Sequence, residues 1–223
     1  VINPKDGYRQ FREVLLVVGR KNGKSLFASA IANYTFFEDG GFGTRVYCVA
    51  PKLDQADIIY NDIWTMILLE PDLKENKEDL KENTARHRMT DLFIESTNST
   101  VKKIAFSAKK SDGFNPSLCI CDEIAAWKSD GPYNDVKQGM SARRQPLMFE
   151  ITTAGFVRNS IYDTQYAYAS RWLDGEIEDD RFIPFIWELD RTDDWMHDEE
   201  CWYKANPGLG TIKSIDTLRG FVQ

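Results

Sequence analysis

The stretch that decides the fold is residues 14–25, which read Val-Leu-Leu-Val-Val-Gly-Arg-Lys-Asn-Gly-Lys-Ser. Residues 14–18 form an apolar run that is too short for a typical helix and rich in β-branched side chains, so we predict a buried strand. Gly23-Lys24-Ser25 then opens a stretch with helical character, residues 26–37, which Gly40-Gly41 closes. The sequence therefore predicts a strand, a glycine-containing loop and a helix in direct succession.

A loop in this position suits a phosphate group, because a glycine-containing turn aims several backbone N–H groups at one point. The start of the following helix adds unpaired N–H groups and the positive end of its dipole. We expect Lys24 to reach the β- and γ-phosphates of a nucleotide and the Ser25 hydroxyl to bind Mg²⁺. The predicted phosphate-binding residues are Gly19, Arg20, Lys21, Asn22, Gly23, Lys24 and Ser25.

The match to the pattern G-x-x-x-x-G-K-[ST] is incomplete. Val18 occupies the first glycine position, and Gly19 follows one residue late. A Gly-Lys-Ser triplet is common, so a basic turn between a strand and a helix remains the alternative for this loop taken alone.

A second pattern lies about a hundred residues downstream. Four apolar residues, 118–121, are followed by Asp122 and Glu123. A strand that ends here would bring Asp122 to the edge of the sheet beside the metal bound by Ser25, and Glu123 would orient or deprotonate the attacking water. Strands commonly end in polar residues, so this pattern is informative only together with the upstream loop. The pair predicts nucleotide hydrolysis with ATP and Mg²⁺ as cofactors.

Strands and helices alternate along most of the chain, which predicts an α/β fold with a mainly parallel sheet covered on both faces. Apolar residues spaced by three and four predict helices that start near Asp54 and that contain Tyr162 and Leu173. Residues 74–88 are charge-rich and are expected to form a solvated helix or loop. The remaining predicted strands are residues 45–50, 92–94, 101–106 (paired with 92–94 around Asn98), 147–152 and 182–189, and the last predicted helix is 214–222.

Composition excludes several classes of protein. Hydrophobic residues make up 42% of the chain, enough for a soluble domain with a sizeable core. No apolar run approaches the roughly 18 to 20 residues that cross a bilayer, so we expect a cytoplasmic protein with no membrane partner. The formal net charge of −7 argues against a surface adapted as a whole to nucleic acid. The four cysteines contain no C-x-x-C pair and are expected to be buried residues rather than zinc ligands.

The loop Gly-Arg-Lys-Asn-Gly-Lys-Ser, with an arginine after its opening residue, resembles the deviant Walker A motif of tailed-phage terminase large subunits. Four further segments resemble that family in the same order along the chain: residues 49–56, 112–118, the coupling motif at 151–155 and a late turn at 205–210. The resemblance implies a RecA-like (ASCE) P-loop ATPase motor that drives double-stranded DNA through a capsid portal. It further implies a homo-oligomeric ring, the portal protein and small terminase subunit as partners, and the host bacterial cytoplasm as location.

The resemblance also implies roles for individual residues. Arg20 matches an arginine that senses or stabilises the γ-phosphate, and would act with Lys24 and Glu123 in catalysis; the alternative is that Arg20 only pairs with a nearby carboxylate. Thr152 and Thr153 match residues that link hydrolysis to movement; the alternative is that they are ordinary strand residues. Six basic residues could reach as a finger into a neighbouring subunit, although a surface charge is the favoured interpretation of each: Arg86, Arg88, Lys109, Lys110, Arg143 and Arg144.

We expect residues 1–190 to form the ATPase domain and residues 191–223 a linker or subdomain that leads towards a nuclease domain. Terminases also carry an adenine-contacting segment upstream of the loop, usually with a glutamine, and Gln10 lies too near the loop to fill that role confidently. Little chain follows the late turn, so we expect no nuclease activity from these 223 residues. The acidic residues before that turn, Asp179, Asp180, Asp193 and Asp194, are expected to form a solvated surface.

Two other functions share the nucleotide motifs. A helicase-like translocase ATPase would need a second RecA-like lobe, and none is evident in the sequence. A regulatory module that binds nucleotide without hydrolysing it would have no need for the water-activating Glu123. A small-molecule kinase is less favoured, because no substrate-phosphate site is evident.

Overall fold

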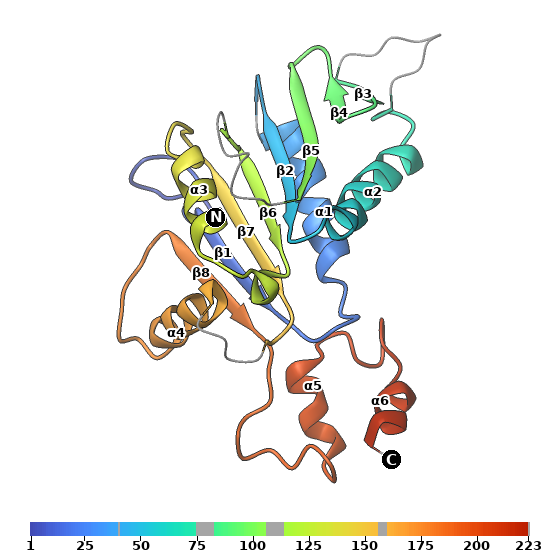
Figure 1. Cartoon of the computed structure of the whole chain (residues 1–223), viewed down its shortest axis with the longest axis vertical. Coiled ribbons are helices and arrows are strands. Elements are labelled where there is room, and N and C mark those ends of the chain that lie inside the picture. Colours follow the sequence, from blue (N-terminus) through green and yellow to red (C-terminus); the bar gives the residue numbers. More distant parts are fainter. Residues whose placement is uncertain (40, 75–82, 106–113, 156–159, 223) are drawn as a thin grey trace.

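The computed structural model describes residues 1–39, 41–74, 83–105, 114–155 and 160–222. The strands of these residues form one eight-stranded sheet with the order β3-β4-β5-β2-β6-β7-β1-β8 (Figure 1). Neighbouring strands are parallel except in the pairs β3–β4 and β4–β5. The strands are β1 (Glu13–Val17), β2 (Arg45–Ala50), β3 (Ala85–His87), β4 (Leu92–Ile94), β5 (Ser99–Ala105), β6 (Leu118–Asp122), β7 (Leu147–Thr152) and β8 (Phe182–Ile186).

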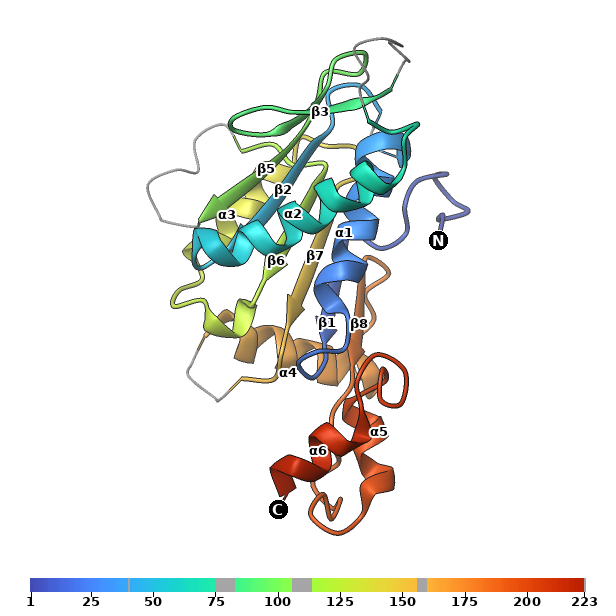
Figure 2. The ribbon, with the colours of Figure 1, turned by 90° about the vertical axis from the view of Figure 1, so that its right-hand side faces the viewer.

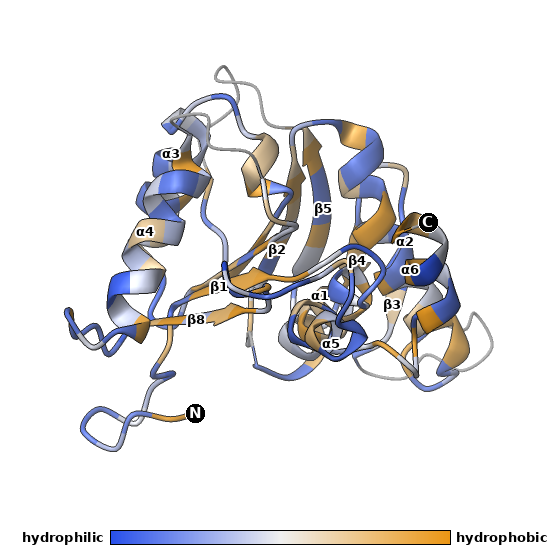
Figure 3. Ribbon diagram, turned by 90° about the horizontal axis from the view of Figure 1, so that it is seen from below, coloured by the Kyte–Doolittle hydropathy of each residue, from blue (hydrophilic) through white to orange (hydrophobic). Residues whose placement is uncertain are grey.

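Helices cover both faces of this sheet (Figures 1 and 2). One face packs against α1 (Lys24–Tyr34) and α2 (Leu53–Leu69), and the other against α3 (Gly131–Met140) and α4 (Ile161–Leu173). The alternation of the strands divides the core accordingly, since Leu16 faces the α1 side and Leu15 the α3 side. Figure 3 shows the apolar character of the adjacent strands β1 and β8.

Local sequence explains where these helices lie. In α2 the buried positions include Ala56, Ile59, Ile63 and Ile67, at the three- and four-residue steps of one helix face. Helix α4 begins with a capping box between Ser160 and Asp163. None of the helices in the described part of the chain combines the length and the apolar composition that crossing a lipid bilayer demands.

The predicted α/β class with a mainly parallel sheet is confirmed, and β2 and β7 match their predicted bounds residue for residue. The predicted hairpin around Asn98 is also present, as β4 paired antiparallel with β5. The interpretation of residues 74–88 as a solvated helix or loop is wrong for Ala85–His87, which pair with β4 as a third antiparallel strand. Residues 75–82 of that segment lie outside the described residues.

Two further features differ from the sequence-based expectations. Helix α1 does not continue regularly towards Gly40 but ends at Tyr34 in a π-helical turn, Thr35–Asp39. Helix α3 has no counterpart among the predicted helices. Pro132 suits the first turn of the helix, but Gly139 near its end disfavours a helix by local propensity. A Cβ atom at Gly139 would lie 2.6 Å from the carbonyl oxygen of Phe114, so close packing requires glycine at this position.

Residues 189–222 form a small unit of their own beyond one end of the sheet, which we call the C-terminal unit (Figures 1 and 2). It contains a 3₁₀ turn (Glu199–Cys201), α5 (Trp202–Ala205) and α6 (Ile215–Val222). Cys201, Trp202 and Leu209 form its buried cluster, which is separate from the two clusters that cover the sheet. The C-terminal unit therefore has a core of its own, and the sheet does not supply it.

Candidate active site

The strand order determines which segments meet at one edge of the sheet. Strand β7 lies between β1 and β6, and all three are parallel. Their carboxyl ends therefore lie together, with Thr152 opposite Val17 and Asp122 opposite Ile151. The loop after β1, the acid pair after β6 and the predicted coupling residues after β7 converge at this edge. The predicted nucleotide site requires the loop and the acid pair to lie close together, and the structure brings them together.

The loop after β1 has the backbone of a phosphate-binding turn. Lys21 and Gly23 have left-handed backbone conformations, with φ of 64° and 79°. Gly23 is the N-cap of α1 and offers no side chain to its first N–H groups, which remain available to an anion. Lys24 is the first residue of the helix, so its side chain starts where that positive dipole end lies.

The ammonium of Lys24 and the carboxylate of Glu123 join the two predicted motifs directly, with Nζ and Oε1 2.9 Å apart. Glu123 adopts a left-handed backbone conformation with φ of 52°, an uncommon geometry for a residue with a side chain. The neighbouring Asp122 stabilises this turn, because its Oδ1 accepts a hydrogen bond of 2.9 Å from the Glu123 N–H. Trp127 also stabilises this turn, because its indole N–H donates a hydrogen bond of 3.0 Å to the Asp122 carbonyl.

Asp122 is 4% exposed, and its environment favours the protonated form. Burial raises the pKa of Asp122, the positive charge of Lys24 partly offsets this increase, and the negative charge of Glu123 adds to it, which gives a pKa of about 6. A cation placed beside this carboxylate would lower the free energy of its charged form. The electrostatics of this position therefore suit a metal-binding acid.

The donor set at this edge fits Mg²⁺ that arrives with a nucleotide. In the part of the chain that the structure describes, no three His, Cys, Asp or Glu side chains are grouped closely enough to hold a metal ion by themselves. Magnesium commonly uses one or two protein carboxylates and completes its shell with substrate phosphates and water. Asp122 and the hydroxyl of Ser25, in the first turn of α1, provide such a partial set.

Thr152 connects the end of β7 to the acid pair. Its side chain is fully buried, and its hydroxyl oxygen accepts a hydrogen bond of 3.2 Å from the Ala125 N–H. The same hydroxyl donates to the Thr153 carbonyl at 2.9 Å. The Thr152 carbonyl in turn accepts from the Val18 N–H at 3.2 Å. Thr152 thus touches both the segment that follows Glu123 and the start of the phosphate loop, whereas Thr153 contributes its backbone to these contacts.

Arg20 lies in the loop at this edge, whereas the described finger candidates do not gather there. Arg20 is exposed and forms no ion pair within the described residues. Arg86 pairs with Glu95, Arg88 binds Asp91 through two hydrogen bonds, and Lys109 and Lys110 lie outside the described residues. Arg143 donates to backbone carbonyls of Asn115 and Gly43, and Arg144 lies over the ring of Tyr8 at 4.9 Å from its centroid. Arg143 and Arg144 precede β7, so they lie near the sheet edge opposite the acid pair.

A cavity of about 540 Å³ adjoins the phosphate loop at Gly23 and Lys24, and sequence reasoning missed it. Its walls are largely apolar and aromatic, with Phe27 from α1 and Phe149 from β7 among them. Alternate residues of β8 and its extension, Ile183, Phe185 and Trp187, line another wall. Large apolar side chains at every second position of residues 182–189 indicated a strand with one apolar face. No local pattern shows, however, that this face stays uncovered by a helix. Gln10 does not line this cavity.

Comparisons with known proteins agree with this geometry. The family model of the terminase large subunit ATPase domain matches residues 4–171. The chain is 36% identical over 103 residues to protein YmfN of Escherichia coli K12, and 26% identical over 207 residues to the terminase large subunit of Enterobacteria phage HK97. These matches cover 46% and 90% of this chain but only 22% and 38% of the two relatives, so the chain spans well under half of their length.

A solved structure supports the same fold. The crystal structure of the HK97 bacteriophage large terminase superposes with a TM-score of 0.80 at 21% sequence identity, covering 95% of this chain and 42% of the other. The sheet with its phosphate loop, acid pair and intervening strand is accordingly a P-loop NTPase fold. The family match extends over most of the sheet and both site motifs, and the chain therefore belongs to the family of terminase large subunit ATPase domains.

Proposed function

We propose that this chain binds ATP with Mg²⁺ and hydrolyses it as the motor domain of a phage or prophage large terminase, driving double-stranded DNA into a procapsid. The observation that carries the proposal is the contact of 2.9 Å between Lys24 and Glu123, which joins a phosphate loop to a candidate water-activating carboxylate. The buried Asp122 beside them supplies the expected metal-binding acid.

In this proposal the loop of residues 19–25 cradles the phosphates through its backbone N–H groups, and Lys24 binds the β- and γ-phosphates. Asp122 and Ser25 hold the magnesium ion, which neutralises charge on the phosphates when it is bound. The triphosphate attracts Lys24 away from Glu123, and the freed carboxylate then accepts a proton from the attacking water. The ion pair in the present structure thereby keeps the base inactive until a nucleotide arrives.

Two further roles belong to the same proposal. Arg20, exposed at the entrance of the loop, stabilises or senses the γ-phosphate. Thr152 transmits the loss of the γ-phosphate, because its hydroxyl and carbonyl contact both the segment after Glu123 and the start of the loop. Thr153 is the weaker candidate, since its backbone and not its side chain takes part in these contacts.

We further propose that residues 1–190 are the ATPase domain and residues 191–223 a linker subdomain, and that these residues alone do not cut DNA. The assembled motor would be a homo-oligomeric ring that works with a portal protein and a small terminase subunit on double-stranded DNA in the host cytoplasm. The separate buried cluster of the C-terminal unit supports the division. The family membership supports the proposed partners, which would act with the whole protein rather than with these residues alone.

Substitution of the proposed base tests this function. Glu123→Gln keeps the size of the side chain but cannot accept a proton at neutral pH, so we expect nucleotide binding to persist while phosphate release falls by at least about 10²-fold. The measurement compares steady-state phosphate release from ATP with and without Mg²⁺, alongside binding of a fluorescent ATP analogue. Glu95→Gln is the control, since it removes an exposed carboxylate remote from the site.

Equal rates of hydrolysis by Glu123→Gln and wild type would show that Glu123 is not the base. Tight ATP binding by the wild type with no phosphate release, even with DNA and assembled partners present, would favour a regulatory module over a motor.

A further inference from the structure

The C-terminal unit is hydrogen-bonded to the side chain of Asn22 in the phosphate loop, and Lys213 Nζ also donates to the Arg20 carbonyl of that loop at 3.5 Å. The carboxamide of Asn22 donates from Nδ2 to Asn206 Oδ1 at 3.1 Å, and its Oδ1 accepts from the Gly208 N–H at 3.0 Å. The same Nδ2 donates to the Gly19 carbonyl at 2.9 Å, which fixes the carboxamide to its own loop. The backbone of Asn22 is part of the loop, and both polar atoms of its side chain form hydrogen bonds with the C-terminal unit.

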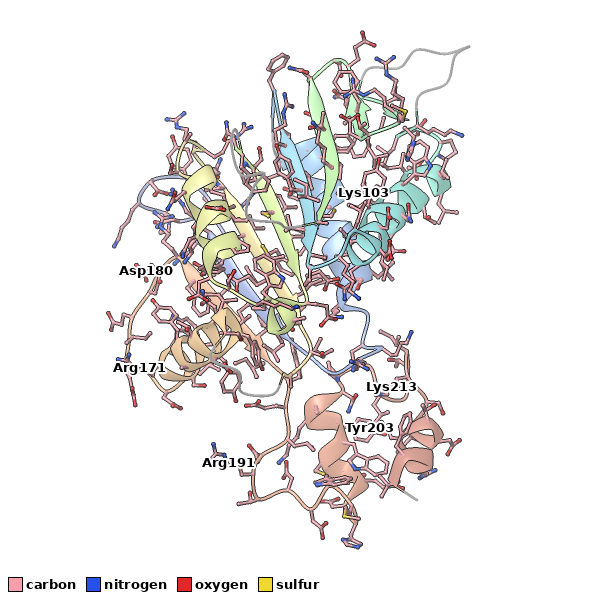
Figure 4. The ribbon with its side chains drawn as sticks, in the orientation of Figure 1. Lys103, Arg171, Asp180, Arg191, Tyr203 and Lys213 are labelled. Carbon is pink, nitrogen blue, oxygen red and sulfur yellow. The ribbon has the colours of Figure 1, made fainter. Side chains whose placement is uncertain are left out.

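Asn206 carries this contact into the core of the C-terminal unit. Its Nδ2 donates to the Trp202 carbonyl at 2.9 Å, and Trp202 is part of the buried cluster of that unit. Its Oδ1 also accepts from Lys213 Nζ at 2.9 Å. Figure 4 shows Lys213 on the side of the C-terminal unit that faces the rest of the molecule. Two successive hydrogen bonds therefore connect the side chain of Asn22 to the backbone of Trp202, through Asn206.

The backbones on the two sides of this contact are unusually close. A Cβ atom at Gly19 would lie 3.0 Å from the Ala205 carbonyl oxygen and 3.1 Å from Asn206 Oδ1. A Cβ atom at Gly208 would lie 3.2 Å from Asn22 Oδ1. A larger residue at either glycine would force its neighbours to move, so the loop and the turn that contains Gly208 pack closely against each other.

We propose that Asn22 is a positioning residue that couples the nucleotide state of the phosphate loop to the orientation of the C-terminal unit. The inference rests on the proposed function in one respect, that a nucleotide binds this loop. A bound phosphate fixes the backbone of residues 19–25, and the Asn22 side chain passes that constraint to Asn206 and Gly208. The C-terminal unit has its own core, so it can move as a body when these bonds change.

Coupling of this kind is reciprocal. A nucleotide that shifts the orientation equilibrium of the C-terminal unit by a given factor must bind the favoured orientation more tightly by the same factor. The contact is therefore measurable from both sides, through the C-terminal unit or through the loop.

Hydrogen–deuterium exchange with and without Mg²⁺ and a non-hydrolysable ATP analogue tests the proposal on the full chain. Asn206→Ala removes the acceptor of the Asn22 carboxamide from outside the nucleotide site, and Asn22→Ala removes the donor from the loop side. Asn206→Asp keeps the oxygen that accepts from Asn22 but loses the Nδ2 donor to the Trp202 carbonyl, so it separates the two steps of the connection. The matched control is Arg219→Ala, which breaks two hydrogen bonds of 2.7 Å to Glu199 within the C-terminal unit without touching the loop.

In the wild type we expect the nucleotide to change the exchange rate of residues 189–222 by at least about fivefold. Asn206→Ala and Asn22→Ala should lose this response, Asn206→Asp should keep only part of it, and Arg219→Ala should keep all of it. Protection of the phosphate loop by nucleotide should persist in Asn206→Ala, which separates loss of coupling from loss of folding or binding. A wild-type chain whose loop is protected while residues 189–222 do not respond would overturn the inference, as would a full response in both alanine variants. Absence of loop protection in the wild type would instead overturn the proposed function itself.

Discussion

Two neighbouring regions of the sheet each bury a carboxyl group, but they differ in the charges that surround it. At the carboxyl edge, Asp122 ends β6 with 4% of its surface exposed, and Lys24 and Glu123 lie beside it. In the middle of β7, Glu150 is completely buried on the face that α3 and α4 cover, and the charge that acts on it most strongly is that of Glu13.

The difference lies in what can compensate the charge. Burial raises the pKa of both groups, but the positive charge of Lys24 limits the increase for Asp122, whose pKa stays at about 6. For Glu150 the negative charge of Glu13 adds to the effect of burial, and its pKa lies well above the ordinary value. A carboxylate can therefore be charged at the edge, where a cation or a metal–nucleotide complex meets it, while the interior favours the neutral acid.

The largest effect is expected at the compensating cation. Lys24→Met should remove two charge-assisted hydrogen bonds of about 2 kcal/mol each to the nucleotide, which weakens binding by about a thousandfold. Titration with a fluorescent ATP analogue measures this change. Lys128→Met, which removes an exposed lysine, should bind as the wild type does. Unchanged affinity in Lys24→Met would mean that the edge is not organised around this cation.

The second effect separates function from stability at the edge. Asp122→Asn keeps an acceptor for the Glu123 N–H but removes the buried charge. We expect Mg²⁺-dependent turnover to fall by about 10²-fold. We also expect the free energy of unfolding without nucleotide to rise by about 1–3 kcal/mol at neutral pH, because the raised pKa means that the charged form costs stability. Urea denaturation and phosphate release measure the two parts, and a variant that is less stable than wild type would contradict this account of the edge.

The smallest effect on turnover is expected in the interior, where the change appears in stability and depends on pH. The raised pKa of Glu150 means that the folded protein holds this proton more tightly than the unfolded chain, whose carboxyl group titrates near 4.5. Wild-type stability should therefore fall relative to Glu150→Gln as the pH rises above that value, by at most about 1.4 kcal/mol per pH unit, until the folded-state pKa is reached. Below about pH 4.5, where the carboxyl group is protonated in both states, its titration should contribute little to the stability difference between the two proteins.

Urea denaturation of both proteins between about pH 4 and about pH 8 tests this sign. ATP turnover should be the same in both, since Glu150 lies away from the acid pair. A stability difference that is independent of pH would show that Glu150 is not buried as a neutral acid, and the contrast with Asp122 would then fail.

Much of the fold was predictable because its signals are local. The apolar run of β1, the glycine loop and the helical spacing of α2 each depend on residues that are neighbours in the sequence. The acid pair was predictable for the same reason, as four apolar residues followed by two carboxylates. Helix α3 was not, because its low hydrophobicity and Gly139 argue against a helix, and the burial of Tyr133, Val136 and Met140 against the sheet stabilises it.

The site was predictable in its chemistry but not in its full surroundings. Thr152 was chosen by resemblance, and its contacts with Ala125 and Val18 follow only from the insertion of β7 between β1 and β6. Strand order is a property of long-range pairing, and no single strand encodes it. The roles of Arg20 and Thr153 stay predictions that turnover measurements must test.

By itself the sequence determined which chemical groups this protein offers: a phosphate loop, a lysine, a serine hydroxyl and two successive carboxylates. Short-range periodicity and backbone preference are enough to specify such segments. Only the tertiary structure decided which of them meet. It also explains why a glycine stands at position 19, where the late turn approaches within 3.0 Å of its would-be Cβ. Asn22 and Asn206, 184 residues apart in the chain, come into contact only because burial of two separate cores positions the C-terminal unit against the loop.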